Sequence, residues 1–368
     1  MIRRLSIFAQ AATIAAMPVD VKSAADPAIE PRHAAPQRRR RWLRVSVLVL
    51  AVLALLAGAG ALAATLYARD INQDIARIEA FDQVPQQARP AKEQAAGDAM
   101  NFLVLGSDTR DPAATGGSRS DTIILLHLPA DRSGAQLVSI PRDTWVHVPR
   151  SADGRHGDTN AKINAAFAWG GTPLMVQTVE DYTGVRIDHV AMVDFAGFKD
   201  IVDALGGVEI DVEQAFTSTH SLNPDSIREF EAGPQTMDGA AALDYARERY
   251  AFADGDFARI RHQQQVIKAI LSKASSGGIL TSPGRLNSFL RATADAVAVD
   301  GTLNIFGMAG DLRHLRSENL TFYTSPTSGT GTRGDQSVVL PDRAKAKVFF
   351  DAVRRDDTAT IAATGTVK

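Results

Sequence analysis

The sequence contains no cysteine in 368 residues, and this absence removes several kinds of chemistry. A chain without thiols has no cysteine nucleophile, no disulfide framework and no thiolate ligands for a metal. The motifs GxxxxGK[ST], HExxH and GxSxG are also missing, which argues against a nucleotide-phosphate loop, a zinc protease and a serine hydrolase. The formal net charge is only -2, so the chain lacks the basic excess typical of nucleic-acid-binding proteins. We therefore expect no nucleic-acid partner.

The longest uncharged run of the chain contains the residues from Val45 to Tyr67. A helix of this length measures about 34 Å, which is enough to cross the ~30 Å hydrocarbon core of a bilayer. Arginines crowd its N-terminal side from Arg38 to Arg44, whereas the other side offers only Arg69. The positive-inside rule then predicts a single-pass protein of the cell membrane with its N-terminus inside and the bulk of the chain outside. A cleaved signal peptide is the competing interpretation, but the run is too long and no Ala-x-Ala site precedes an obvious mature start.

The remaining sequence divides into segments by composition and periodicity. We predict a disordered cytoplasmic tail at 1–44, a transmembrane helix at 45–67, an extracellular stalk at 68–97, a catalytic domain at 98–355 and a disordered tail at 356–368. Within the domain, short apolar runs that end at Gly, Pro or Ser predict strands: Asn101 to Leu105, Thr122 to Leu128 and Gln136 to Ile140. A further strand is predicted from Val208 to Val212, where apolar and acidic residues alternate.

Helices alternate with these strands. Sequences typical of caps and stops predict helices after Asn160, from Thr172 to Gly184, after Asp194, after Asp238, after Asp256 and from Asp342 to about Arg354. The alternation predicts a single α/β domain with a mixed central β-sheet and helices on both faces.

Six arginines share short motifs with two aspartates, Asp108 and Asp121. These arginines are Arg119, Arg142, Arg247, Arg249, Arg259 and Arg261. A guanidinium group stays charged and presents a planar fork that fits phosphate oxygens. Several guanidinium groups that converge without an equal number of carboxylates require an outside anion, and a pyrophosphate with a bound cation would fit.

The two aspartates flank neighbouring predicted strands. Asp108 follows the first strand and Asp121 precedes the second, so pairing of the strands would bring both carboxylates to one edge of the sheet beside Arg119. Carboxylates of this kind suit Mg²⁺ together with phosphate and water, although either aspartate alone is also typical of a turn cap. Arg142 and Asp143 follow the third strand after Pro141, which directs them to the same edge or into a pair with each other.

The segment from Asp244 to Gln265 is the most specific part of the sequence. Arg259 and Gln263 lie four residues apart on a predicted helix, so both side chains can reach one ligand, whereas Arg261 points elsewhere. Lys162 is predicted in the first turn of a helix, where a solvated lysine is the usual finding and a phosphate contact is the alternative.

The sequence resembles the LytR-CpsA-Psr family of cell-envelope enzymes from Asn101 to about Arg354. The resemblance rests on GSD, RSDT, SIPRD, KINAA, VDFAGFKDIVDALGGV and YARERYAFADGDFARIRHQQ, which occur in this order. It implies a transferase that moves a glycopolymer, such as teichoic acid, arabinogalactan or capsule, from a polyprenyl-pyrophosphate carrier to a peptidoglycan acceptor through a phosphodiester.

The resemblance also assigns roles to residues. Asp108 and Asp121 would hold Mg²⁺, with Mn²⁺ as the alternative, and the pyrophosphate would be bound by Arg119, Arg142, Lys162, Arg247, Arg249, Arg259 and Gln263. We expect catalytic roles for Asp121, Arg119, Arg142 and Asp143, with Asp121 or Asp143 as the general base. His262 departs from the family pattern, in which arginine is common, and this puts pyrophosphate affinity or pH response there in doubt.

The tethered polyprenyl substrate predicts a hydrophobic tunnel, and the candidates for its lining are Phe167, Trp169, Phe195, Phe198, Ile201 and Leu205. Ordinary core packing explains each of these residues equally well. Two other functions remain open. One is a secreted Mg²⁺-dependent pyrophosphatase that uses water as acceptor, and the other is a noncatalytic polyprenyl-lipid-binding protein of the envelope.

Overall fold

A computed structural model describes residues 67, 69–107, 120–218, 227–304, 308 and 315–366 of the chain. The predicted cytoplasmic tail lies outside the described residues, as does the predicted membrane span apart from Tyr67. Among the helices of the described part, none is long and apolar enough to cross a bilayer.

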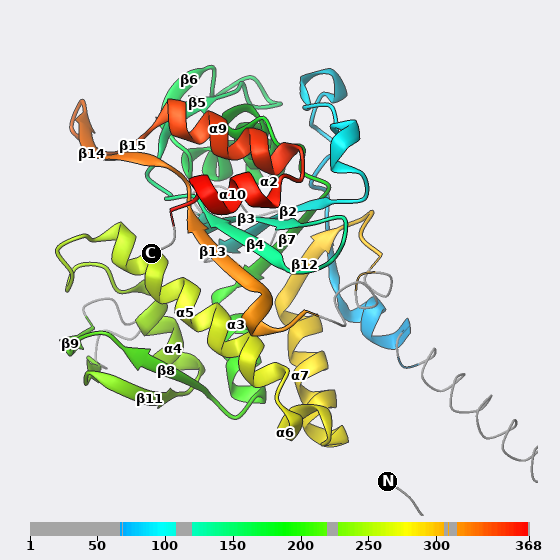
Figure 1. The fold of residues 1–368 in the computed structure, drawn as a ribbon, viewed down its shortest axis with the longest axis vertical. Helices are drawn as coiled ribbons and strands as arrows, with labels where there is room; N and C mark the ends of the chain where they lie inside the picture. The colour runs from blue at the N-terminus through cyan, green and yellow to red at the C-terminus, as the bar shows by residue number, and fades with distance from the viewer. Residues whose placement is uncertain are drawn as a thin grey trace, which may run out of the picture. The chain divides into compact units, whose positions relative to one another are not determined.

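The centre of the fold is a seven-stranded sheet in the order β1-β12-β7-β2-β3-β4-β13 (Figure 1). Its strands are β1 (Ala76–Ile78), β2 (Met100–Ser107), β3 (Ser120–Leu128), β4 (Ala135–Ser139), β7 (His189–Asp194), β12 (Val297–Asp300) and β13 (Leu320–Thr324). Strand β2 runs antiparallel to β3 and parallel to β7, so the sheet is mixed. The prediction of a mixed sheet is confirmed, and the first three predicted strands correspond to β2, β3 and β4.

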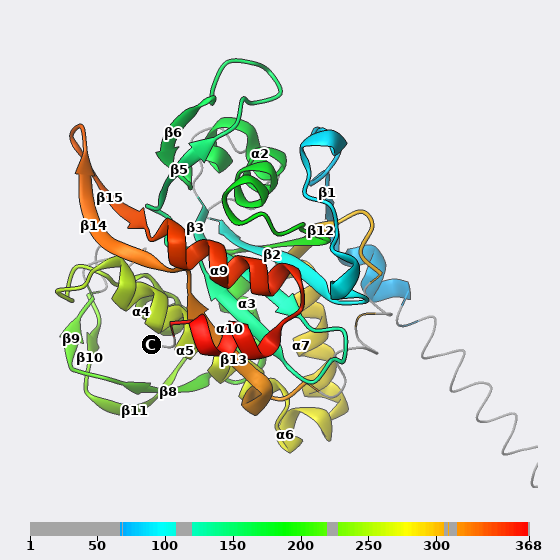
Figure 2. The same cartoon turned by 45° about the horizontal axis from the view of Figure 1, so that its top comes forward.

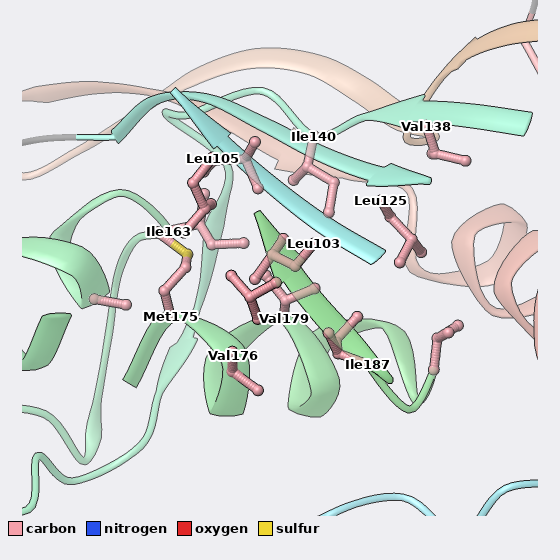
Figure 3. Packing of buried hydrophobic residues seen from close by; sticks show 14 of the residues in the cluster. Leu103, Leu105, Leu125, Val138, Ile140, Ile163, Met175, Val176, Val179 and Ile187 are labelled. Carbon is pink, nitrogen blue, oxygen red and sulfur yellow. The ribbon is translucent and has the colours of Figure 1, made fainter. Parts of the chain in front are cut away.

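The two faces of the sheet are covered by different helices (Figure 2). On one face, Leu103 and Leu105 are fully buried against α2 (Ala165–Thr183) and α9 (Arg343–Arg354). Figure 3 shows Leu103 beside Val179 in this layer. On the other face, the intervening Val104 packs in a cluster with Ile267 of α5 (Asp256–Ala274). Because successive side chains of a strand point to opposite faces, β2 contributes apolar residues to the core on both sides of the sheet. The prediction of helices on both faces is confirmed.

A second hydrophobic cluster lies on the α5 side. It joins α5 to α3 (Phe195–Ala204), α4 (Gly239–Arg247), α7 (Pro283–Ala296) and the hairpin of β8 (Val208–Val212) with β11 (Gly233–Met237). The strand predicted at Val208 to Val212 is thus present, but it pairs outside the central sheet.

The remaining described elements are short. They are the pairs β5 (Trp145–Val148) with β6 (Thr159–Lys162), β9 (Phe216–Thr217) with β10 (Glu229–Phe230) and β14 (Thr327–Arg333) with β15 (Gln336–Pro341), the helices α6 (Gly277–Leu280) and α10 (Thr358–Thr364), and the 3-10 turns η1 (Gln86–Ala88), η2 (Gln94–Ala96) and η3 (Ser317–Asn319).

Local cap signals placed several helix ends correctly. Asp194 accepts hydrogen bonds from the backbone N–H groups of Ala196 and Gly197 at the start of α3, and Asp238 accepts one at the start of α4. Gly184 ends α2 in the left-handed conformation, with φ 69°. The prediction for Asp256 was wrong, because Gly255 is the N-cap of α5 and Asp256 is its first residue.

Two predicted helices form the single helix α2. The segments after Asn160 and from Thr172 are joined across Gly170 and Gly171, whose backbone angles are not helical. The helix is therefore kinked at the place where we predicted a break. The first segment also starts later than predicted, since residues Thr159–Lys162 form strand β6. Lys162 therefore lies at the end of a strand and not in the first turn of a helix.

The domain extends beyond both predicted boundaries. Within the predicted stalk, β1 pairs with β12. The Arg89 guanidinium binds the buried carboxylate of Glu180: the Nε–H group is shared between Oε1 and Oε2, and Nη2 donates to Oε1. Beyond the other boundary, where we predicted a disordered tail, α10 buries Ile361 completely. Both segments have the polar composition of linkers, but a few apolar side chains and several ion pairs, among them Arg89–Glu180 and Lys92–Asp188, fix them to the core.

Candidate active site

The candidate site begins at the edge of the sheet where β2 ends and β3 begins. Ser107 at the end of β2 pairs with Ser120 at the start of β3, and Ser107 also lies beside Asp194 at the end of β7. Asp121, the second residue of β3, is thereby held at this edge. The predicted pairing of the two strands is confirmed, while the predicted site residues Asp108 and Arg119 lie outside the described residues.

Arg142 reaches the same edge from β4. The backbone N–H of Ile140 donates to the carbonyl of Ile123, 2.8 Å away, which places the following residues alongside the start of β3. The Arg142 guanidinium then donates from Nη1 to Oδ1 of Asp121. Pro141 breaks the strand at this point, so the chain leaves the sheet and carries Arg142 to the predicted rim.

The α4–α5 segment supplies the other side of the site. Arg247 is the last residue of α4 and stacks over the Phe195 ring at 4.8 Å, and Arg249 follows directly after the helix. Arg259 and Gln263 project from one face of α5 one turn apart, as predicted. Arg261 points elsewhere, also as predicted, and pairs with Asp254 and Glu213.

These side chains surround one end of a pocket of about 380 Å³. Its polar end is formed by Asp121, Arg142, Arg247, Arg249, Arg259 and Gln263. Apart from Thr122 and Asp194, the rest of the lining is apolar. It comes mainly from the α5 face of the sheet, α3 and α5, including Val104, Ile124, Phe198, Ile201, Ile267 and Ile270. The pocket therefore suits a ligand with an anionic group at one end and an apolar body behind it.

Of the tunnel residues considered from the sequence, those on α3 line the pocket: Phe195, Phe198 and Ile201. Phe167 and Trp169 belong to α2, which packs in the hydrophobic cluster on the opposite face of the sheet. Leu205 is buried in the second cluster. The sequence could not separate these groups, because which face of the sheet a helix covers depends on the topology of the chain.

Positive charge exceeds negative charge in the described lining of the pocket. Four arginines and two aspartates contribute to it. Arg142 is paired with Asp121, whereas Arg249 has no carboxylate within salt-bridge distance among the described residues; its guanidinium lies over the ring of Tyr250. An anion bound at this end of the pocket would balance the excess in the lining.

Asp256 is a member of the site that the sequence interpretation missed. Its Oδ1 lies 2.5 Å from Nη2 of Arg259 and 3.9 Å from Nε of Arg142, yet neither of its carboxylate oxygens has an aligned hydrogen bond. Burial raises the pKa of Asp256, and the neighbouring Asp143 acts in the same direction. The signal was present in the GDxxR part of the motif, but we interpreted this aspartate as a helix cap.

The buried Nε atoms of Arg142 and Arg259 also lack hydrogen-bond partners, although the two arginines lie against Asp256. A buried polar atom without a partner costs free energy. Asp256 therefore holds the two guanidinium groups close together without satisfying their Nε atoms.

Asp143 and Lys162 form a neighbouring pair. Lys162 Nζ lies 3.1 Å from Asp143 Oδ1, and Asp143 Oδ2 lies 3.9 Å from Nε of Arg142. Neither residue is in the described lining of the pocket. Of the two predicted candidates for a general base, Asp121 is the one that lines the pocket.

His262 does not belong to the pocket. It is 1% exposed and packs among aromatic rings, with its centroid 4.3 Å from that of Tyr245 and 4.7 Å from that of Phe252. Burial, reinforced by the positive charge of Arg261, lowers the pKa of His262 to about 4. The imidazole is therefore neutral at pH 7 and contributes no charge to an anion site.

This burial predicts an acid sensitivity of folding. The folded pKa of His262 is about 4 against 6.5 for the free side chain, so between these values the unfolded state binds the proton more tightly. The stability that the neutral imidazole contributes is fully present above pH 6.5 and is lost as the pH falls toward 4, by about 3 kcal/mol. We expect His262→Phe to reduce the loss of stability over this range, measured by urea unfolding at a series of pH values.

The matched control is His156→Phe, because His156 is exposed and stacks on Trp169. Its pH profile is expected to follow that of the wild type. Equal slopes for wild type and His262→Phe would show that this imidazole does not control the acid transition.

Known proteins match most of the chain. The model of the LytR_cpsA_psr family matches residues 61–354. A probable cell wall biosynthesis protein LcpB of Corynebacterium glutamicum is 35% identical over 280 residues, which cover 73% of this chain and 64% of that protein. This chain thus spans slightly less than two thirds of the length of that relative.

A second relative is the polyisoprenyl-teichoic acid–peptidoglycan teichoic acid transferase TagU of Halalkalibacterium halodurans. It is 32% identical over 255 residues, which cover 69% of this chain and 78% of that protein. Among solved structures, TagV of B. subtilis superposes with a TM-score of 0.56 and 25% identity, over 72% of this chain and 97% of TagV. The sheet and its covering helices therefore form a fold that is already known from crystal structures.

Proposed function

The chain belongs to the LytR-CpsA-Psr family, and from this premise we propose that it is a phosphotransferase of the cell envelope. In this proposal it takes a glycopolymer from a polyprenyl-pyrophosphate carrier and joins it to peptidoglycan through a phosphodiester. The name of the TagU relative supports this substrate class, since that protein is a polyisoprenyl-teichoic acid–peptidoglycan transferase.

The shape of the pocket is the observation that carries the proposal. Arginines occupy one end, and Ile267 and Ile270 lie further along the same helix, α5. At 1.5 Å per residue, Arg259 and Ile270 are separated by about 16 Å along the helix axis. A polyprenyl pyrophosphate has the same order of groups, with two phosphates followed by an apolar tail. Each CH₂ group that the pocket shields from water would contribute about 0.8 kcal/mol to binding.

The arginines account for most of the catalysis that we propose. The acceptor hydroxyl attacks the phosphorus that carries the glycan, the bond to the bridging oxygen breaks, and polyprenyl phosphate leaves. Arg142, Arg249 and Arg259 hold the phosphates and neutralise the charge that moves onto the leaving group. The hydroxyl proton must pass to a base, and Asp121 is suitably placed at the polar end of the pocket.

Magnesium is part of the proposal, with Mn²⁺ as the alternative. The described residues contain no group of three or more potential ligands of the His, Cys, Asp or Glu type, but Mg²⁺ in phosphate sites commonly uses one or two carboxylates together with phosphate and water. Asp121 fits this need, because it lines the polar end and only its Oδ1 contacts Arg142. Asp108, by resemblance, would be the second ligand. The cation would neutralise charge on the phosphate oxygens.

Removal of divalent cations is expected to stop turnover but to spare binding of the lipid tail, because the apolar part of the pocket contains no metal ligand. Turnover and lipid binding would be measured in parallel with excess chelator and after Mg²⁺ is restored. Full turnover in excess chelator would contradict the metal role of Asp121.

The proposed location follows from the substrate. A polyprenyl carrier remains in the bilayer, so we propose that the uncharged run at 45–67 anchors the enzyme, with the N-terminus inside and the catalytic domain outside. The arginines before this run and the scarcity of basic residues immediately after it support this orientation.

Two measurements on the full-length protein test the proposed function. Mass spectrometry of copurified lipid is expected to detect a polyprenyl pyrophosphate. Incubation of a lipid-linked glycan with peptidoglycan is expected to give a glycan–peptidoglycan phosphodiester and polyprenyl phosphate. Release of glycan phosphate to water alone would indicate a pyrophosphatase, and binding without cleavage would indicate a lipid-binding protein.

A further inference from the structure

The stretch of sequence between Asp256 and Asp295 contains no Asp or Glu, although the formal net charge of the whole chain is -2. It forms most of α5, the short helix α6 and most of α7. Its cations are Arg259, Arg261, Lys268, Lys273, Arg285 and Arg291. Because these charges are not balanced within the stretch, they attract acidic groups from elsewhere in the fold or from another molecule.

Three of these cations are engaged within the fold. Arg259 lines the pocket beside Asp256, Arg261 forms the ion pairs described above, and Arg291 binds the segment that precedes β1. The other three are exposed and have no carboxylate within salt-bridge distance in the part of the chain that the structure describes: Lys268, Lys273 and Arg285. These three are available to an anionic partner.

The three available cations lie at one end of the fold. Lys268 and Lys273 belong to the last two turns of α5, Arg285 belongs to the first turn of α7, and the short helix α6 joins the two (Figure 1). Ile279 of α6 packs with side chains of both helices in one hydrophobic cluster. The end of α5 and the start of α7 are therefore held together, and we call residues 268–286 the α5–α7 tip.

The segment before β1 indicates where the chain enters the domain. The Tyr67 hydroxyl donates a hydrogen bond of 2.7 Å to Oδ1 of Asn287, and the guanidinium of Arg291 lies 3.0 Å from Asp70 and 3.5 Å from Asp74. The segment therefore runs parallel to α7. Traced back from Asp74 to Tyr67, the chain approaches the start of α7 and with it the α5–α7 tip.

The apolar end of the pocket lies toward the same tip. Ile270 lines this end and belongs to the last turns of α5, between the exposed Lys268 and Lys273. Leu271 is 36% exposed and adds an apolar side chain beside these lysines. Basic side chains interspersed with exposed apolar ones are typical of surfaces that contact the headgroup region of a bilayer.

We propose that the α5–α7 tip docks on the anionic lipid headgroups of the bilayer through Lys268, Lys273 and Arg285. The inference rests on the proposed location, in which the run at 45–67 is the membrane anchor, since the direction of the chain at Tyr67 then brings the tip to the membrane surface. It adds an orientation of the domain to the proposed function. The apolar end of the pocket faces the lipid that supplies the polyprenyl tail, and the arginines at the polar end face away from the bilayer.

The absence of cysteine from the chain makes a labelling test direct. Gly284→Cys places a label at the tip, where an added Cβ meets no heavy atom within 4 Å, and Gly301→Cys places the same label at an equally open position beyond α7 and β12. The full-length protein is reconstituted in phosphatidylcholine vesicles with or without phosphatidylglycerol and labelled from outside with a fluorophore that does not cross the bilayer. Quenching by spin-labelled lipids then reports contact with the membrane.

We expect quenching at position 284 in vesicles that contain phosphatidylglycerol, a large loss of it in pure phosphatidylcholine, and little quenching at position 301 in either. Each basic residue close to an anionic surface favours docking about fivefold. The triple change Lys268→Gln, Lys273→Gln and Arg285→Gln is therefore expected to weaken docking by up to about a hundredfold and to abolish the quenching at 284.

A charge-matched control removes three exposed cations from other parts of the fold: Arg155→Gln, Arg333→Gln and Lys345→Gln. This control is expected to retain the quenching at 284. Four results would overturn the inference: equal quenching at 284 and 301, quenching at 284 that does not depend on phosphatidylglycerol, quenching that survives the triple change at the tip, or an equal loss in the control.

The same vesicles distinguish the inference from the proposals on which it rests. Release of the wild-type protein by alkaline carbonate would defeat the proposed membrane anchor, and the docking surface with it. A protein that stays anchored and transfers glycan without quenching at 284 would defeat the inference alone. A protein that docks as expected but forms no transfer product would defeat the proposed reaction and leave the docking surface in place.

Discussion

Replacing Arg142 with alanine is expected to lower the rate of transfer by about a thousandfold or more, the effect of losing an arginine that stabilises phosphoryl transfer. Arg142 lines the pocket and contacts Asp121, so its loss removes positive charge from the place where the leaving group forms. Single-turnover rates with saturating donor and acceptor would measure this loss.

The same change is expected to cost only modest stability. Asp256 keeps Arg259 as a partner and Asp143 keeps Lys162, while Asp121 is left beside the pocket. Arg261→Ala is the control, since Arg261 lies on α5 like Arg259 but pairs with Asp254 and Glu213. Normal turnover by Arg142→Ala, or an equal loss in Arg261→Ala, would remove Arg142 from the proposed mechanism.

Replacing Arg259 with alanine is expected to affect stability as well as activity. The Arg259 side chain is only 4% exposed and lies against the buried Asp256. Removing one partner of a buried ion pair leaves an uncompensated charge and costs about 3–5 kcal/mol. Urea unfolding would show this loss together with the loss of transfer.

A double variant separates the two effects. Adding Asp256→Asn to Arg259→Ala removes the unpaired carboxylate, so we expect most of the lost stability to return. Transfer is expected to remain low, because the guanidinium that binds phosphate is still missing. Recovery of transfer in the double variant would mean that Arg259 acts only through Asp256. No recovery of stability would mean that the unpaired carboxylate of Asp256 is not the cause of the loss.

Local signals carried a large part of the prediction. The strands β2, β3 and β4 were recognisable because each is a short apolar run that ends at a residue unsuited to a strand interior. Asp194, Asp238 and Gly184 marked helix ends because their side chains or backbone angles satisfy the last unpaired groups of a helix. The spacing of Arg259 and Gln263 also predicted their common direction, since four residues complete about one turn.

Residues whose structural role depends on contacts with distant parts of the sequence were assigned wrongly or missed. Lys162 was assigned to a helix, because its role as the last residue of β6 depends on pairing with Trp145. Asp256 was read as a cap because its contact with Arg142 joins residues far apart in the chain. The boundaries were too narrow for the same reason: Ile78, Val84 and Ile361 are scattered apolar residues in polar segments and become core only against elements elsewhere in the fold.

The sequence by itself determined the residue types of the site and most of the helices and strands, because cap preferences and periodicity act over a few residues. The convergence of Asp121, Arg142 and the arginines of α4 and α5 on one end of an apolar pocket was decided by the tertiary structure. So was the separation of Phe198 from Phe167 onto different faces of the sheet. These relations depend on strand order and helix packing, which bring together side chains that no local pattern connects.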